Sequence, residues 1–223
     1  MTPVRSNTGL LARAEARVLE ALITRVPRGV TPDALSALGL AGAAITALGF
    51  AQTSNGPLWL GLACLGLVVN WVGDSLDGRL ARDRGPDRGM AGFMLDNGID
   101  MVAYMVIAIG FALSGLVAPL VPFLLLCLYL MLTNLALARL AATGVFELAV
   151  GAIGTTELRV CFLVLAAILM FVPYELVETS VLIGLRPLDI VSVIWMSGMI
   201  VGFGLALRAD VRRHWAGRSG RSA

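Results

Sequence analysis

The sequence contains no lysine, a single histidine and only three cysteines among its 223 residues. The cysteines, Cys64, Cys127 and Cys161, lie inside apolar runs and form no CxxC pair, which argues against a zinc site and against a disulfide framework. Charged residues make up 14% of the chain, whereas a typical soluble domain carries about 25%. This shortage of charge argues against a soluble globular protein.

The chain is instead rich in long apolar runs, and 58% of its residues are hydrophobic. Several runs approach the roughly 20 residues that a helix needs to cross a bilayer. None of them alternates between apolar and polar residues as the strands of a membrane barrel do. The predicted fold is therefore an all-α integral membrane protein with six transmembrane helices, near residues 33–53, 57–82, 91–115, 118–141, 156–174 and 188–208.

The N-terminal region has a different pattern. Residues 8–26 place apolar side chains at helical spacing, with Arg13, Arg17 and Arg25 among the polar positions. This pattern is typical of an amphipathic helix that lies on the membrane surface, although an ordinary packed helix would show it too. We therefore divide the chain into a juxtamembrane segment (1–30), a six-helix domain (31–210) and a basic tail (211–223).

The arginines predict the orientation of the chain in the membrane. With six spans, 16 of the 17 arginines fall in the termini and in the connections on one side, and only Arg186 falls on the other. Basic residues accumulate in cytoplasmic connections. We therefore expect both termini on the cytoplasmic side of a multi-pass protein, with a bacterial inner membrane as the host.

Four carboxylates stand out at the predicted cytoplasmic edge. Asp74 and Asp77 are three residues apart near the end of the second span, so they share one helix face. Asp96 and Asp100 are four residues apart near the start of the third span and share a face in the same way. A short connection makes these two helices antiparallel neighbours, and we expect both pairs to converge at one depth.

Such a cluster requires a cation, because even one buried unpaired charge costs several kcal/mol. Clustered carboxylates are hard oxygen ligands suited to Mg²⁺ or Mn²⁺, and such ions clamp phosphoryl groups during displacement. The alternative is pairing with the arginines of the intervening connection, which are Arg79, Arg82, Arg84 and Arg88.

Small residues surround the acids. Gly78 follows Asp77, Ala81 lies one helical turn further on, and Gly92 lies one turn before Asp96. A glycine inside a helix costs about 1 kcal/mol, so close approach of a ligand would explain it. Packing between membrane helices through small residues explains it equally well. Arg82 adds a forked donor suited to phosphate.

Together these residues form the pattern D-x2-D-G-x2-A-R-x9-G-x3-D-x3-D, which resembles the motif of the CDP-alcohol phosphotransferase family at all eight fixed positions. The segment T-P-D-A-L-S at residues 31–36 resembles the family's T-P-N-x-L-T, with Asp33 and Ser36 in place of Asn and Thr. The resemblance implies six transmembrane helices around a cytoplasm-facing polar cavity, an N-terminal juxtamembrane helix and a homodimer.

The resemblance also implies a reaction. A substituted phosphoryl group moves from a CDP-linked donor to an alcohol, and CMP is released. Asp74, Asp77 and Asp96 would be ligands of Mg²⁺ or Mn²⁺, and Asp100 would be the general base and a possible second-metal ligand. The residues implied to line the nucleotide site are Gly78, Ala81, Arg82, Asp33 and Ser36.

Two further arginines bear on the substrate. Arg139 lies in A-L-A-R-L-A-A-T-G, which resembles a stretch of the phosphatidylinositol phosphate synthase branch. Arg159 ends a Glu-x-Arg that resembles the end of that branch's E-R-x-E-R segment. Both side chains are candidates for binding an anionic acceptor, and the alternative is that they reach for the membrane surface or pair with Glu147 and Glu157.

We therefore expect a CDP-diacylglycerol donor and a small polar alcohol acceptor. The alternative within the family is a CDP-choline or CDP-ethanolamine donor with a diacylglycerol acceptor. From another class, an ion or solute transporter would also place acids inside a helical bundle. A transporter has no need of Gly78, Ala81 and Gly92 around the acids, and the sequence therefore favours the enzyme.

Overall fold

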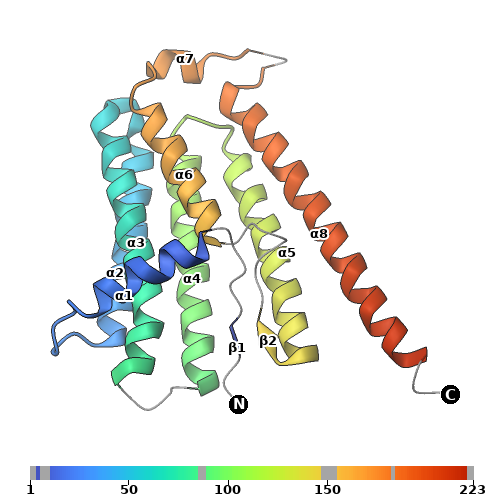
Figure 1. Ribbon diagram of the computed structural model, residues 1–223. Helices are drawn as coiled ribbons and strands as arrows, with labels where there is room; N and C mark the ends of the chain where they lie inside the picture. Colours follow the sequence, from blue (N-terminus) through green and yellow to red (C-terminus); the bar gives the residue numbers. More distant parts are fainter. Residues whose placement is uncertain (1–3, 6–10, 85–88, 147–154, 182–183, 220–223) are drawn as a thin grey trace.

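The computed structural model describes residues 4–5, 11–84, 89–146, 155–181 and 184–219, and the described chain is almost entirely helical (Figure 1). The elements, in chain order, are β1 (Val4–Arg5), α1 (Ala12–Ile23), α2 (Pro32–Ala51), a 3₁₀ helix η1 (Thr53–Asn55), α3 (Pro57–Arg84), α4 (Gly89–Ala112), α5 (Leu120–Thr143), β2 (Val145–Phe146), α6 (Thr155–Leu169), α7 (Tyr174–Glu178) and α8 (Pro187–Ser219). β1 and β2 pair in parallel, with Val4 opposite Val145.

Helix α2 has extensive contacts with two neighbouring helices. Its start follows from the local sequence, because Thr31 is extended and accepts a hydrogen bond from the Ala34 amide at 3.2 Å, and Pro32 occupies the first helical position. From there α2 packs along both α3 and α4, whereas α3 and α4 touch each other much less. The predicted pairing of α3 with α4 is therefore only part of the arrangement, since α2 is the main neighbour of both.

Small residues let α2 and α3 approach closely. A Cβ atom added to Gly42 would clash with the backbone of Asn70, and one added to Gly73 would lie 2.6 Å from the carbonyl oxygen of Leu35. The same holds between α2 and α4, where a Cβ on Gly110 would clash with the backbone of Ala47. Close backbone contact through small residues is how helices associate without a hydrophobic driving force between them. These glycines are therefore packing residues.

Helix α1 lies across the bundle and packs on α3 (Figure 1). Its Leu19 is 2% exposed and joins Leu35 of α2 with Leu76 and Leu80 of α3 in a buried cluster. The Trp71 indole also donates to the Glu15 carboxylate at 3.3 Å. The predicted N-terminal helix is thus present over Ala12–Ile23, and one of its faces is held by the domain.

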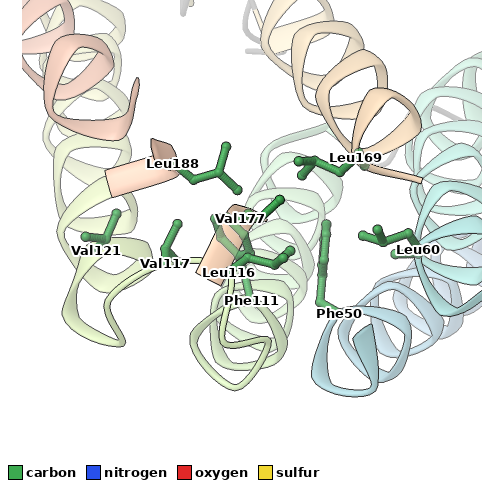
Figure 2. Close-up of a cluster of buried hydrophobic side chains, with 11 residues drawn as sticks. Phe50, Leu60, Phe111, Leu116, Val117, Val121, Leu169, Val177 and Leu188 are labelled. Atoms are coloured by element: carbon green, nitrogen blue, oxygen red, sulfur yellow. The ribbon is translucent and has the colours of Figure 1, made fainter. Parts of the chain in front are cut away.

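The main hydrophobic core (Figure 2) lies where α2 and α4 end and where α3 and α5 begin. It is built from α2, α3, α4, α6 and the segments around α7, and its members include Phe50, Phe111, Leu116, Leu169 and Leu188. Asp189 is buried at the start of α8 and accepts hydrogen bonds from the amides of Ala118, at 2.7 Å, and Arg186, at 3.0 Å. This polar contact fastens α8 to the connection between α4 and α5.

Five helices of the described chain are long and apolar enough to cross a membrane: Pro32–Ala51, Pro57–Arg84, Gly89–Ala112, Leu120–Thr143 and Pro187–Arg213. The remaining predicted span, 156–174, corresponds to α6, which has 15 residues and a shorter apolar stretch, Arg159–Leu169. Figure 1 shows that α6 begins part-way along the bundle. The protein is a multi-pass membrane protein, and the count of six spans stays a prediction.

Successive long helices up to α5 run in opposite directions through the bundle, as the predicted topology requires. The C-terminal ends of α3, α5 and α8 and the N-terminal ends of α2 and α4 lie at the same end of the molecule (Figure 1). Helix α8 continues to Ser219, so residues 211–219 of the predicted tail extend that helix. Large apolar side chains such as Ile194, Val201 and Leu205 are exposed along α8, as expected for a helix surface that faces lipid.

Candidate active site

One pocket collects all four aspartates of the motif. It is lined by residues of three helices: Ser36 and Gly39 from α2, Asn70, Asp74 and Asp77 from α3, and Asp96, Ile99, Asp100 and Ala103 from α4. Helix α2 therefore forms one wall of the pocket, and the acids lie on the other two helices, α3 and α4. The wall between α2 and α3 is held by the Asn70 side-chain amide, which donates to the Gly39 carbonyl at 2.9 Å.

Asp77 is the most buried of the four, with 6% of its surface exposed. The Ser36 hydroxyl donates to its Oδ2 at 2.5 Å, and the Gly78 amide donates to its Oδ1 at 2.5 Å. The Ser36 hydroxyl oxygen also lies 3.2 Å from the Pro32 carbonyl oxygen, one turn back along α2, which is the weaker of the two contacts. Both carboxylate oxygens of Asp77 thus have a donor, which fixes the side chain and compensates its burial.

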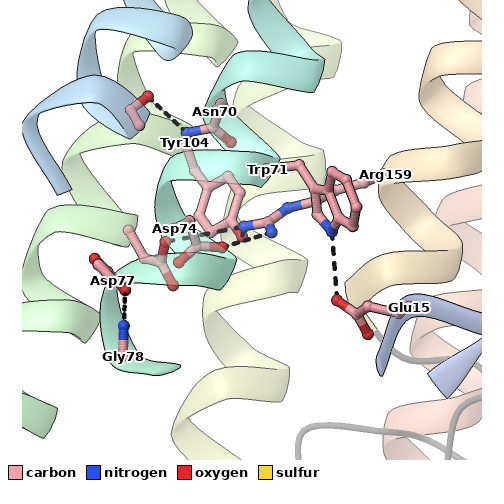
Figure 3. A network of polar contacts seen from close by, with 10 residues as sticks. Glu15, Asn70, Trp71, Asp74, Asp77, Gly78, Tyr104 and Arg159 are labelled. Carbon is pink, nitrogen blue, oxygen red and sulfur yellow. Dashed lines mark hydrogen bonds and ion pairs between the residues drawn. The ribbon is translucent and has the colours of Figure 1, made fainter. Parts of the chain in front are cut away.

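Asp74 pairs with an arginine from the other half of the chain. Arg159, in the first turns of α6, places Nη1 2.5 Å from Oδ2 of Asp74 and Nη2 3.9 Å from Oδ1 of Asp100. The same Nη2 donates to the Tyr104 hydroxyl at 2.6 Å, and the guanidinium carbon lies 5.7 Å from the centre of the Tyr104 ring. Figure 3 shows the guanidinium between Asp74 and Tyr104.

A pair of aromatic residues stands behind this contact. The rings of Tyr104 on α4 and Tyr129 on α5 lie 4.7 Å apart in an edge-to-face arrangement. Thr133, one turn further along α5, donates to the Tyr129 carbonyl at 3.1 Å. Helix α5 therefore contributes to the site through Tyr129, which positions the tyrosine that Arg159 touches.

The residues implied for the nucleotide lie at two places. Ser36 lines the pocket, and Asp33 lies one turn earlier, in the first turn of α2. Gly78, Ala81 and Arg82 continue α3 beyond the pocket towards its C-terminal end. A Cβ added to Gly78 would meet only the Arg82 guanidinium, at 3.5 Å. Gly78 therefore differs from Gly73, because among the described residues no atom of another helix lies within 4 Å of the added Cβ.

The alternative prediction pairs the acids with the arginines of the α3–α4 connection, and the described contacts of one of these arginines, Arg84, lie elsewhere. Arg84 instead donates to the carbonyls of Val26, Pro27 and Val30 at 2.6, 2.9 and 3.3 Å, and so it fastens the α1–α2 connection to α3. Arg88 lies outside the described residues. The partner of Asp74 comes from α6, a pairing that spacing along the chain did not indicate.

The two acceptor candidates are placed differently. Arg159 is at the pocket, whereas Arg139 on α5 pairs with Asp210 on α8, its Nε 2.6 Å from Oδ2. Of the alternative partners, Glu147 lies outside the described residues. Glu157 is buried and accepts a hydrogen bond from the Leu11 amide at 2.7 Å. The structure thus brings Arg159, and not Arg139, to the four aspartates.

Tyr104 is the contact that sequence reasoning missed. It lies four residues after Asp100, so it shares a helix face with Asp96 and Asp100. That spacing was a usable signal, since a hydroxyl on the acidic face is a natural second partner for a cation. Asn70, four residues before Asp74, is the corresponding case on α3.

The donor set suits a divalent cation. Four carboxylates and a hydroxyl around one pocket are the hard oxygen ligands that Mg²⁺ and Mn²⁺ prefer. In the described part of the chain, however, no three acids are drawn together tightly enough to enclose an ion. Asp74 is engaged with Arg159. The residues that line the pocket therefore fit the metal in chemical kind, and their spacing in this structure is wider than a bound ion requires.

The sequence profile of CDP-alcohol phosphatidyltransferases matches residues 29–204, which is most of the chain and includes the whole pocket. The chain belongs to the CDP-alcohol phosphatidyltransferase family. No curated protein matches it significantly. As a member of this family, the protein is a membrane-bound transferase that moves a phosphoryl group from a CDP-alcohol in phospholipid synthesis.

Proposed function

We propose that this CDP-alcohol phosphatidyltransferase transfers a phosphatidyl group from CDP-diacylglycerol to a small polar alcohol and releases CMP. The observation that carries the proposal is the pocket, in which all four aspartates of the motif meet Ser36 of the T-P-D-A-L-S segment. Two separate parts of the family pattern, 41 residues apart at Ser36 and Asp77, therefore meet at one site.

Asp74, Asp77 and Asp96 are the proposed metal ligands, and Asp100 is a possible ligand of a second ion. A bound Mg²⁺ or Mn²⁺ ion supplies positive charge that neutralises the donor diphosphate and stabilises CMP as it leaves. The Ser36 hydroxyl and the Gly78 amide hold the Asp77 carboxylate in place. An anionic donor would otherwise be repelled by the acidic pocket.

Asp100 is the proposed general base. The hydroxyl oxygen of the acceptor forms a bond to the phosphorus that bears the lipid, and the bond from that phosphorus to the bridging oxygen breaks. CMP keeps the bridging oxygen, and the hydroxyl proton passes to the Asp100 carboxylate. Asp100 lines the pocket with the other acids, and 28% of its side chain is exposed, so an acceptor can reach it.

The nucleotide is proposed to bind along the C-terminal part of α3. Gly78 and Ala81 offer small side chains there, and Arg82 offers a forked donor for phosphate. The open space beside Gly78 supports this placement, since no neighbouring helix of the described chain explains its lack of a side chain. Asp33 and Ser36, at the start of α2, complete the proposed contacts.

The acceptor is proposed to bind beside Arg159, whereas Arg139, which pairs with Asp210, is left out of the proposed acceptor site. Both arginines lie on the helices that follow α4, and Arg159 reaches the acids directly. The site is proposed to face the cytoplasm of a bacterial inner membrane, because 16 of the 17 arginines fall on that side of the predicted topology. A homodimer is the proposed assembly.

The test is CMP release from the purified full-length protein in detergent. CDP-diacylglycerol is supplied with glycerol 3-phosphate, serine, inositol or inositol phosphate, one at a time, and CDP-choline or CDP-ethanolamine is supplied with diacylglycerol in parallel. We expect CMP with the lipid-linked donor and one polar acceptor. Release only from the CDP-aminoalcohols would reverse the donor assignment, and no release with any pair would reject the proposed activity.

A further inference from the structure

Arg159 is an unusual neighbour for residues that are proposed to bind a divalent cation. Its Nη1 is 2.5 Å from Oδ2 of Asp74, and its Nη2 is 3.9 Å from Oδ1 of Asp100. A guanidinium so close to two carboxylates lowers the electrostatic cost of crowding four acids around one pocket. Arg159 therefore supplies a positive charge at the place where a metal would also supply it.

The surroundings of Arg159 show that its position is built into the fold. Only 16% of its side chain is exposed, and its Nε is buried without a hydrogen-bond partner in the described structure. The Tyr104 hydroxyl accepts from Nη2 at 2.6 Å, and the Tyr104 ring lies beside the guanidinium. Burial of an arginine with one donor unsatisfied is costly. Its contacts with Asp74 and Tyr104 offset that cost.

The same carboxylate oxygen cannot serve both cations well. A metal ion bound through Oδ2 of Asp74 would lie within a few Å of the guanidinium, and two positive charges at that distance repel strongly in a partly dry pocket. Tyr104 gives the guanidinium a second partner that remains when Asp74 is taken. Release of Asp74 therefore does not leave the arginine without contacts.

We propose that Arg159 is a built-in competitor of the divalent cation for Asp74: the arginine neutralises the acidic pocket and yields Asp74 when the metal binds. This inference rests on the metal site of the proposed function. It predicts that removal of Arg159 changes the metal affinity in the opposite direction from that expected for a purely supportive role. An arginine that only orients Asp74 and Asp100 for the metal would strengthen metal binding, whereas a competitor weakens it.

The experiment measures Mn²⁺ binding to the full-length protein in detergent, without donor or acceptor, from the electron paramagnetic resonance signal of free Mn²⁺. Arg159→Gln is compared with the wild type and with Arg139→Gln. Arg139 is a matched control because it is also an arginine in an ion pair, with Asp210 at 2.6 Å, and its side chain is 19% exposed. We expect Arg159→Gln to bind Mn²⁺ at least about tenfold more tightly and Arg139→Gln to bind it like the wild type.

A double-mutant cycle with Asp74→Asn shows where the competition occurs. If the arginine and the metal compete for Asp74, the gain from Arg159→Gln shrinks when Asp74 is already replaced. If Arg159→Gln does not fold, Arg159→Met decides in its place. Methionine removes the charge and keeps a long unbranched side chain, so Mn²⁺ again binds more tightly than in the wild type.

The outcomes separate this inference from the proposed function. Wild-type Mn²⁺ binding that Asp77→Asn abolishes supports the metal site. With that binding present, unchanged or weaker Mn²⁺ affinity in Arg159→Gln, or in Arg159→Met where it is used instead, overturns the competition alone. A wild type that binds no Mn²⁺ overturns both the competition and the metal-dependent reaction.

Discussion

Replacement of Gly78 with leucine tests whether this position faces a nucleotide or another helix. Within the described part of the chain, a Cβ at Gly78 would meet only the end of the Arg82 side chain, at 3.5 Å, which is ordinary van der Waals contact. A glycine that packs a helix interface looks different. A Cβ at Gly73 would lie 2.6 Å from the Leu35 carbonyl oxygen and would clash with the backbone of Gly39. Gly73→Leu is therefore the matched control on the same helix.

The expected stability changes have opposite signs. Gly78→Leu should gain up to about 1 kcal/mol, because leucine is the better helix former and the site has room for it. Gly73→Leu should lose about 1–3 kcal/mol or more, because α2 and α3 must move apart to accept the side chain. For a chain of this size 1 kcal/mol corresponds to about 2–4 °C in melting temperature, so the two variants should be clearly separated.

The assay is a melting curve of the purified protein with and without CDP and Mg²⁺. At about 100 times its Kd, a ligand that binds only the folded state stabilises it by about 2.7 kcal/mol, or roughly 5–10 °C here. We expect this gain in the wild type and none in Gly78→Leu, which melts near the wild type without ligand. A Gly78→Leu protein that melts much earlier yet still responds to CDP would refute the placement of the nucleotide.

Two further predictions concern the aspartates. Asp100→Asn should lower kcat by about 10²–10⁴-fold and leave the CDP-induced stabilisation intact, because a base acts in the transition state; normal turnover, measured as CMP release, would show that another group takes the proton. Removal of divalent cations with a chelator should abolish CMP release, and Mg²⁺ or Mn²⁺ should restore it; a full rate in excess chelator would exclude the metal-dependent reaction.

Local spacing was sufficient for the parts of the site that lie within one helix. The three- and four-residue intervals place Asp74 with Asp77 and Asp96 with Asp100 on single faces, and the structure brings both pairs to one pocket. The long apolar runs likewise indicated the membrane helices, and five of them are long enough in the structure. The short α6 was harder to predict, since its apolar stretch begins only at Arg159, after the buried Glu157.

The spacing of residues along the chain could not predict which helices contact one another. Nothing in the local pattern indicates that α2 packs between α3 and α4, because its glycines read equally well as packing or ligand-facing residues. A Cβ added at Gly42 or Gly73 would clash with the backbone of the facing helix, so these two glycines are packing residues. Among the described residues, a Cβ added at Gly78 would meet no facing helix. Only the folded arrangement of the helices separates these two kinds of glycine.

The sequence by itself determined that the protein is a helical membrane protein with an acidic motif of a phosphatidyltransferase, because hydrophobicity and helical periodicity are local properties of the chain. The tertiary structure alone decided which cation faces those acids. Arg159 is 85 residues from Asp74 in the chain, and its nearer candidate partners were glutamates. Its pairing with Asp74 depends on the place at which α6 enters the bundle, which is a property of the packed helices and not of any one of them.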